Sequence, residues 1–101
     1  MVDELVRDIQ ARSAQLRGLN ARVRFVLGGG GGDVILLDAR TANVSVARGD
    51  GEADCTLRIT AENLGKLING KLNPMLAYTM GKLKVEGSTG VAMKLASMLD
   101  S

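Results

Sequence analysis

The chain has 101 residues, of which 46% are hydrophobic and 24% charged, and this composition predicts one globular domain over residues 1–101. Thirteen basic residues stand against eleven acidic ones, with no dense run of Lys and Arg, which argues against a surface that follows nucleic-acid phosphates. The chain has no histidine, one cysteine and only two aromatic residues, which argues against histidine-based catalysis, a thiolate metal cluster, an internal disulfide and base stacking.

The first half of the chain predicts one helix followed by four strands. Residues 3–17 carry their apolar side chains on one helical face. Apolar and polar residues alternate over residues 22–27, 43–47 and 55–60, as strands with one buried face do. Residues 33–38 are too continuously apolar to alternate, which predicts a central strand or one covered on both faces. Together these strands indicate a sheet that helices cover on one side.

The second half predicts three helices and a fifth strand. A helix is expected over residues 61–69, with Thr60 as its N-cap. Asn73 followed by a proline opens a second, short helix, because asparagine caps well and proline fits the first helical position. Residues 82–86 alternate charged and apolar side chains and predict a strand, and a last helix is expected over residues 88–99 with a serine cap.

Two loop motifs could hold ligands but lack the required context. Residues 28–32 are consecutive glycines, yet Asp33 and a strand follow them instead of a helix, which favours a loop between antiparallel strands over a phosphate cradle. Asp50, Glu52 and Asp54 form an acidic cluster, but the spacing of a calcium loop is absent. A solvated hairpin turn is the interpretation we favour for this cluster.

We expect no enzymatic activity, no cofactor and no bound metal, because no nucleophile, base and oxyanion site come together in the sequence. Cys55 has no histidine to activate it and alternates in phase with Leu57 and Ile59, which predicts a buried, unreactive thiol. A single cysteine suits the reducing cytoplasm, and the acidic residues 1–4 do not resemble a secretory signal. Cytoplasmic localisation is therefore expected. No apolar run is long enough to span a membrane.

The last predicted helix is more apolar than a helix packed on one sheet requires. At 100° per residue its apolar side chains cover an arc of roughly 220°, against the roughly 100° that one packing face needs. All four internal methionines lie in the final 27 residues, and flexible thioethers suit surfaces that adapt to varied apolar shapes. Two interpretations stay open: this helix faces an apolar ligand, or it is buried in a dimer interface or between core layers.

Four short blocks follow one another in the second half of the chain. They read Asp-Cys-Thr-Leu-Arg-Ile-Thr at residues 54–60, Gly-Lys-Leu-Asn-Pro at 70–74, Gly-Lys-Leu-Lys-Val-Glu-Gly at 81–87 and Ala-Met-Lys-Leu at 92–95. In order and spacing they resemble the sterol carrier protein type-two family of lipid-transfer domains. The first half of the chain matches that family in pattern, with one helix and then strands.

The resemblance implies an α+β fold, in which a five-stranded sheet with helices packed on one face encloses an apolar tunnel. It also implies non-catalytic binding and intracellular transfer of fatty acids, fatty acyl-CoA, sterol-like or isoprenoid lipids. Carried over by position, the lipid-binding wall would comprise Leu64, Leu67, Ile68, Met75, Leu76, Met80, Val91, Met93, Leu95 and Met98.

One residue departs from the family pattern. Ala96 follows the Lys-Leu pair where relatives often carry glutamine, so a polar contact for a sterol hydroxyl is missing. The expected partners are a lipid or acyl-CoA ligand and, transiently, a membrane surface, with no nucleic acid; the chain is expected to be a monomer or weak dimer. The alternative function is a protein-interaction or dimerisation module that uses the apolar C-terminal helix.

Overall fold

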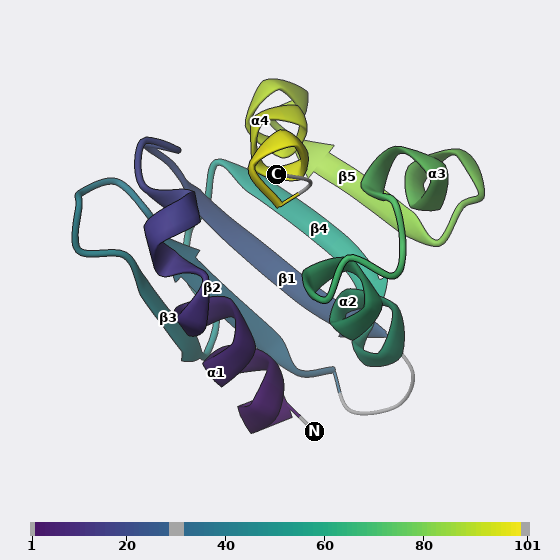
Figure 1. The fold of residues 1–101 in the computed structure, drawn as a ribbon, viewed down its shortest axis with the longest axis horizontal. Coiled ribbons are helices and arrows are strands. Elements are labelled where there is room, and N and C mark those ends of the chain that lie inside the picture. Colours follow the sequence, from purple (N-terminus) through teal and green to yellow (C-terminus); the bar gives the residue numbers. More distant parts are fainter. Residues whose placement is uncertain (1, 29–31, 100–101) are drawn as a thin grey trace.

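The computed structural model describes residues 2–28 and 32–99. The elements along the chain are α1 (Val2–Ala11), the 3₁₀ turn η1 (Ser13–Leu16), β1 (Arg22–Gly28), β2 (Val34–Asp38), β3 (Ser45–Arg48), β4 (Cys55–Thr60), α2 (Ala61–Ile68), α3 (Pro74–Thr79), β5 (Leu83–Gly87) and α4 (Thr89–Leu99). The five strands form one sheet in the order β3-β2-β1-β4-β5 (Figure 1). The strands β1 and β4 pair in parallel, and the other neighbours pair antiparallel.

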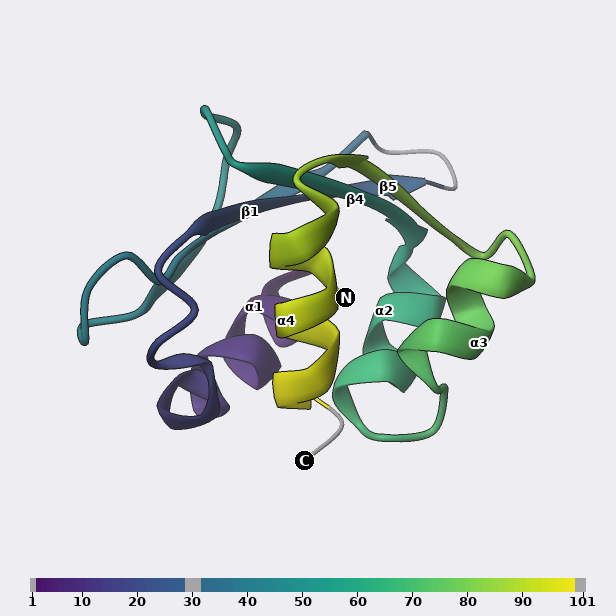
Figure 2. The same ribbon diagram turned by 90° about the horizontal axis from the view of Figure 1, so that it is seen from above.

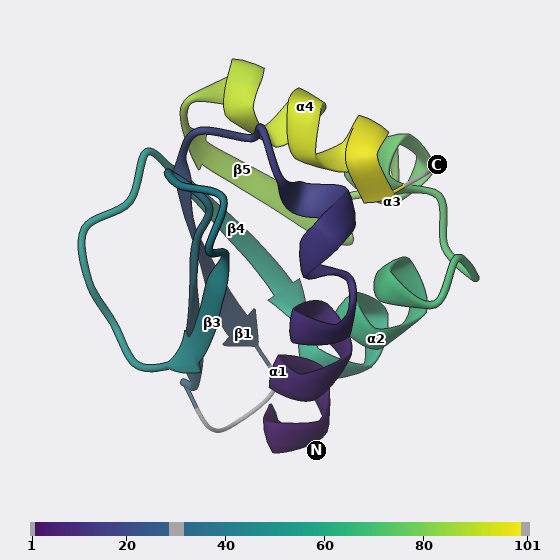
Figure 3. The same ribbon diagram turned by 60° about the vertical axis from the view of Figure 1, so that its left-hand side comes forward.

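Helices α1 to α4 all lie against the same face of the sheet. Figure 2 shows this layering edge-on, with the strands on one side and the helices on the other. Figure 3 shows α1 running alongside β3, while α4 lies near β5. The predicted α+β fold, with a five-stranded sheet and helices packed on one face, is confirmed.

Alternating side chains on the central strands build the core. In β1 the side chains of Val23 and Phe25 are buried while Arg24 points to the outer face. In β4 Leu57 is buried in the same way, and the parallel register places it beside Phe25. The sheet therefore presents one apolar face to the helices, as the alternation predicted.

Three predicted helix caps are present. The side-chain oxygen of Thr60 accepts a hydrogen bond from the backbone N–H of Asn63 at 3.1 Å, at the start of α2. Asn73 caps α3 by accepting from two backbone N–H groups, those of the second and third helical residues. The hydroxyl of Ser88 accepts from the backbone N–H of Val91 at 3.2 Å, at the start of α4. These local signals set where the helices begin.

The helix predicted over residues 3–17 is shorter than expected, because α1 ends at Ala11. Arg12 has φ −99° and ψ 14°, and the N–H of Gln15 donates to its carbonyl in the tighter 3₁₀ pattern. The chain changes direction there while Leu16, the last residue of η1, stays fully buried. The strand predicted over residues 43–47 is likewise shifted, to Ser45–Arg48.

The acidic segment is not a hairpin turn, contrary to the prediction. The strands on its two sides, β3 and β4, are separated by β2 and β1, so this segment crosses the outer face of the sheet. There Asp50 forms an ion pair with Arg24 at 2.9 Å, and Gly51 packs against Leu36. This contact covers the outer side of β2 and explains why that strand does not alternate between apolar and polar residues. The predicted glycine loop joins antiparallel strands as expected, but its residues 29–31 lie outside the described part of the chain.

Gly87, the last residue of β5, occupies a position that only glycine fits. Its φ is +83°, and an added Cβ would lie 2.7 Å from the carbonyl oxygen of Asp54. The same carbonyl accepts the N–H of Ser88 at 2.9 Å, which ties the start of α4 to β4. Glycine here allows two backbone segments to approach closely.

The Gly87→Ala variant should therefore be destabilised by about 1–3 kcal/mol in urea unfolding, because the new methyl meets backbone in a left-handed conformation. Gly90→Ala is the matched control. Gly90 lies within α4 without a positive φ, and its nearest atom would be 3.8 Å from an added Cβ. The control should be neutral or stabilised by about 0.4–1 kcal/mol. Equal stability of the two variants would contradict this role of Gly87.

Candidate functional site

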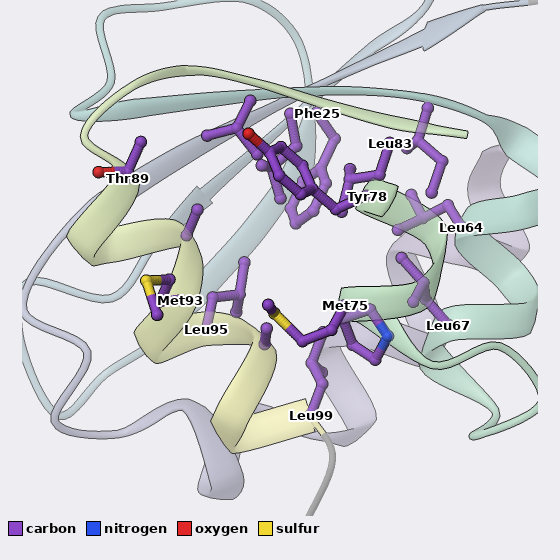
Figure 4. Close-up of a pocket in the computed structure, with 16 residues that line it drawn as sticks. Phe25, Leu64, Leu67, Met75, Tyr78, Leu83, Thr89, Met93, Leu95 and Leu99 are labelled. Carbon is purple, nitrogen blue, oxygen red and sulfur yellow. The ribbon is translucent and has the colours of Figure 1, made fainter. Parts of the chain in front are cut away.

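An apolar pocket of about 160 Å³ lies between the inner face of the sheet and helices α2, α3 and α4 (Figure 4). Thr89 and Tyr78 are the two lining residues with a polar group in the side chain, and the rest of the wall is apolar. The lining residues are Phe25, Leu57, Ile59, Leu64, Leu67, Pro74, Met75, Tyr78, Leu83, Val85, Thr89, Ala92, Met93, Leu95, Ala96 and Leu99.

The sheet supplies the closed side of the pocket. Phe25 from β1 and Leu57 from β4 are nearly inaccessible to solvent, and Leu83 from β5 is also buried. These residues alternate with outward-facing polar ones, so the strand pattern that builds the core also builds the pocket wall.

The helices supply the mouth. Met75 and Tyr78 of α3 and Met93 of α4 are 56%, 54% and 62% exposed, although all three line the pocket. Figure 4 shows the Met75 side chain extending from α3 toward α4. Deeper in the pocket, Leu64 of α2 and Leu95 of α4 are buried. The pocket is thus closed at the sheet and open between α3 and α4, with flexible methionines at the opening.

Five of the ten residues predicted as a lipid-binding wall line this pocket: Leu64, Leu67, Met75, Met93 and Leu95. The other five lie elsewhere. Ile68 is buried in the core, Val91 and Met98 pack half-buried against the core, and Leu76 and Met80 are more than half exposed on α3 and at its end.

Sequence reasoning did not assign the strand residues of the pocket. The resemblance suggested helical positions, whereas Phe25, Leu57, Ile59, Leu83 and Val85 come from β1, β4 and β5. The alternation of apolar and polar residues along these strands did predict that their side chains point inward. That alternation alone could not distinguish a side chain covered by a helix from one that lines a cavity.

Neighbours on several sides explain why α4 is so apolar. It packs against η1 as well as β4 and β5, and Lys94 donates a hydrogen bond to the carbonyl of Gly18 at 2.6 Å. Ala92, Ala96 and Leu99 turn toward the pocket. Of the large apolar side chains on α4, Met93 is the one that is mainly exposed.

No carboxylate, amine, guanidinium or thiol side chain is among the residues that line the pocket. On the outer face a hydrogen bond from Arg58 lowers the pKa of Glu86 below its ordinary value. Cys55 is buried, and burial raises the pKa of its thiol, which keeps it protonated and unreactive as predicted. Among the residues that the structure describes, no cluster of three or more His, Cys, Asp and Glu side chains could hold a metal ion. The arrangement suits binding of an apolar chain.

Within residues 2–28 and 32–99, no helix combines the length and the hydropathy needed to cross a bilayer.

A one-sided sheet whose helices leave an apolar pocket open is the arrangement of a small lipid-binding domain. The chain belongs to the SCP-2 sterol transfer family, whose model matches residues 2–100. It is 41% identical over 64 residues to sterol carrier protein 2 of Gallus gallus, which is 62% of this chain but 12% of that protein. This chain therefore spans about an eighth of the length of that relative.

Solved structures show the same fold. The sterol carrier protein domain 2 of Helicoverpa armigera is 31% identical with a TM-score of 0.69, and the match covers 84% of this chain and 70% of that one. Palmitated SCP2L2 of Aedes aegypti is 19% identical with a TM-score of 0.81, and the match covers 99% of this chain and 95% of that one.

Leu95 and Met93 should respond differently to truncation, although both line the pocket. Leu95 is 2% exposed, and Leu95→Ala should cost about 2–5 kcal/mol of unfolding free energy because it removes buried methylenes. Met93 is 62% exposed, and Met93→Ala should change stability by less than about 0.5 kcal/mol. Urea unfolding of the two variants measures both, and a Met93 cost as large as that of Leu95 would show that Met93 belongs to the core.

Proposed function

We propose that this domain binds single-chain lipids, such as fatty acids, fatty acyl-CoA or isoprenoid lipids, and carries them without chemical change. The observation that carries the proposal is the apolar pocket, closed by Phe25 and Leu57 and open between Met75 and Met93. An apolar chain would enter between the two methionines and lie against the sheet. Its polar headgroup would remain at the mouth, in water.

The size of the pocket implies that the ligand widens it. Ligand pockets usually measure about 300–1,000 Å³, whereas this one measures about 160 Å³. The most exposed wall residues, Met75, Tyr78 and Met93, would move first, because few contacts hold them. Thioether side chains adapt to this repacking at low cost.

The wall composition favours acyl chains over sterols. Ala96 lines the pocket with a methyl group, at the position where the family pattern often has glutamine. A sterol hydroxyl buried beside it would lack that hydrogen-bond partner, and an unpaired buried hydroxyl is costly. A fatty acid needs no buried partner along its chain. The palmitated protein of Aedes aegypti, which has the same fold, supports a fatty acid as the first ligand to test.

The absence of catalysis and the cytoplasmic location are two further parts of the proposal, and each is supported by the side-chain chemistry of the chain. A carrier role without catalysis is supported by a wall whose lining residues include no carboxylate, amine, imidazole or thiol side chain. A cytoplasmic location is supported by the single cysteine, Cys55, which is buried as a free thiol.

Palmitate should stabilise the delipidated protein. At one hundred times the dissociation constant, a ligand specific to the folded state adds about 2.7 kcal/mol, which corresponds to a rise of roughly 10–20 °C in Tm for a domain of this size. Differential scanning fluorimetry and solution titration with palmitate measure the effect. If neither palmitate nor palmitoyl-CoA binds or moves the Tm, the carrier function is wrong.

Filling the pocket should block this effect. Ala96→Leu adds three carbon atoms to the wall, so the chain of palmitate should no longer fit, while apo stability should stay equal or rise. Ala11→Leu is the matched control, because Ala11 is exposed at the end of α1 and lies outside the pocket. The control should keep the full palmitate shift. Normal palmitate binding by Ala96→Leu would place the ligand elsewhere on the molecule.

A further inference from the structure

Helix α3 exposes large apolar side chains that its own fold does not cover. The largest exposed apolar residues among those described are Met75, Leu76, Tyr78, Met80 and Met93, and all but Met93 lie on α3 or directly after it. Each is more than half exposed. Clusters of this kind on a small protein mark surfaces that contact an apolar partner.

Only part of this exposed surface belongs to the pocket. Met75 and Tyr78 line the mouth, whereas Leu76 and Met80 do not touch the pocket. Leu76 and Met80 are four residues apart and therefore neighbours along one side of the helix. Between that edge and the residues of the pocket mouth the helix is closed, since Pro74 and Ala77 are buried against the rest of the molecule. A helix of six residues thus carries a pocket-facing and a solvent-facing apolar edge.

Lysines flank this helix in the sequence. Residues 63–85 contain four lysines and no aspartate or glutamate, and one of the four, Lys66, pairs with Glu62 at 3.5 Å. Lys71 precedes α3 and Lys82 follows it, and both are exposed. The backbone N–H of Lys82 donates to the carbonyl of Ala77 at 2.9 Å, which holds that lysine at the end of the helix. Within the described residues neither ammonium group has an ion-pair partner. We call Lys71, Met75, Leu76, Tyr78, Met80 and Lys82 the α3 ridge.

We propose that the α3 ridge docks on a membrane surface that contains anionic lipids, with the pocket mouth turned toward the bilayer. The proposal rests on the proposed function, because a lipid cargo must enter from a membrane and leave to one. Apolar side chains that insert at the interface and lysines that meet anionic headgroups both strengthen binding to a membrane surface, and the two contributions add.

Charge decides between a membrane and a second copy of this chain. A symmetric dimer through the ridge would bring the same patch of both copies together, and because the ridge holds two lysines and no acidic residue, those lysines would meet positive charge and no carboxylate on the other patch. That arrangement is repulsive, whereas an anionic lipid surface neutralises the same charges. Helix α1 is a poorer membrane contact, since its apolar residues Leu5 and Ile9 are buried and its first turn is acidic.

Docking through this ridge would connect the bilayer to the pocket. Met75 and Tyr78 are shared between the ridge and the mouth, so a lipid leaving the bilayer beside α3 would meet the opening directly. Its chain would then pass from one apolar environment to another with little exposure to water, which lowers the cost of transfer.

The native chain contains its own reporter for the experiment. Tyr78 is the only tyrosine, there is no tryptophan, and Tyr78 lies on the ridge. Its fluorescence should be quenched by vesicles containing brominated phosphatidylcholine with added phosphatidylserine. Sedimentation with vesicles of phosphatidylcholine alone, and with phosphatidylserine at low and high salt, measures affinity. We expect binding that requires phosphatidylserine and weakens with salt.

Two double variants test the two contributions. The double variant Lys71→Gln with Lys82→Gln should lower the affinity for phosphatidylserine vesicles about 30-fold. That is the loss expected when two lysines no longer contribute their attraction to an anionic surface. Leu76→Gln with Met80→Gln should lower it about tenfold or more by removing apolar insertion. The control is Arg7→Gln with Arg17→Gln, which removes the same charge from exposed positions near α1; Figures 1 and 2 place α1 across the molecule from α3. The control should bind normally.

The palmitate titration in solution separates this proposal from the proposed function. A palmitate shift without vesicle binding overturns the docking surface and leaves the carrier function standing. Vesicle binding through the ridge without a palmitate shift supports the docking surface and overturns the carrier function. An equal loss in the Arg7 and Arg17 control shows non-specific charge attraction and overturns the ridge. If the wild-type protein is a dimer that does not bind vesicles, and the Leu76 and Met80 variant is a monomer, the ridge is a self-interface. That result also overturns the docking surface.

Discussion

The parallel pairing of β1 with β4 at the centre of the sheet is the constraint on which the rest of the structure depends. Parallel neighbours cannot be joined by a tight turn, so the chain between them must travel. It does so through β2, β3 and the segment that crosses the outer face, where Asp50 pairs with Arg24. The outer face carries that connection and polar side chains such as Arg24 and Arg58, whereas the inner face is apolar, so the helices gather on the inner one. The register then places Phe25 beside Leu57, at the meeting point of core and pocket.

The pocket is the part of the inner face that the helices do not fill. Helix α1 lies along β3, and its Leu5 and Ile9 are buried in the core. Over β4 and β5 the cover is shared by α2, α3 and α4, which leave about 160 Å³ between them. An empty volume of about 160 Å³ would cost up to ~4 kcal/mol at the penalty per Å³ measured for engineered cavities. That is a large part of the ~5–15 kcal/mol that stabilises a typical domain, so a bound chain would relieve a real penalty.

Local signals were the predictable part of this fold. Thr60, Asn73 and Ser88 cap their helices as expected, because capping depends on a side chain and a backbone group three residues away at most. The path of residues 49–54 was not predictable, since hairpin and crossover segments have the same turn-forming composition. Only half of the residues predicted as a lipid-binding wall line the pocket, and the reason is related. Helical periodicity shows that Leu76 is on an apolar face, but it does not show what that face meets.

Helices α3 and α4 have similarly apolar compositions, but the structure uses their apolar surfaces differently. Both have more apolar surface than one packing face needs. In α4 the excess is used within the molecule, because η1, two strands and the pocket surround it. In α3 it is not, since Leu76 and Met80 face solvent between Lys71 and Lys82. An apolar edge that a fold leaves exposed beside the mouth of its pocket costs solubility without adding to the core. The proposed passage of a lipid between bilayer and pocket would give that edge a physical role, with α3 as the element that both environments would touch.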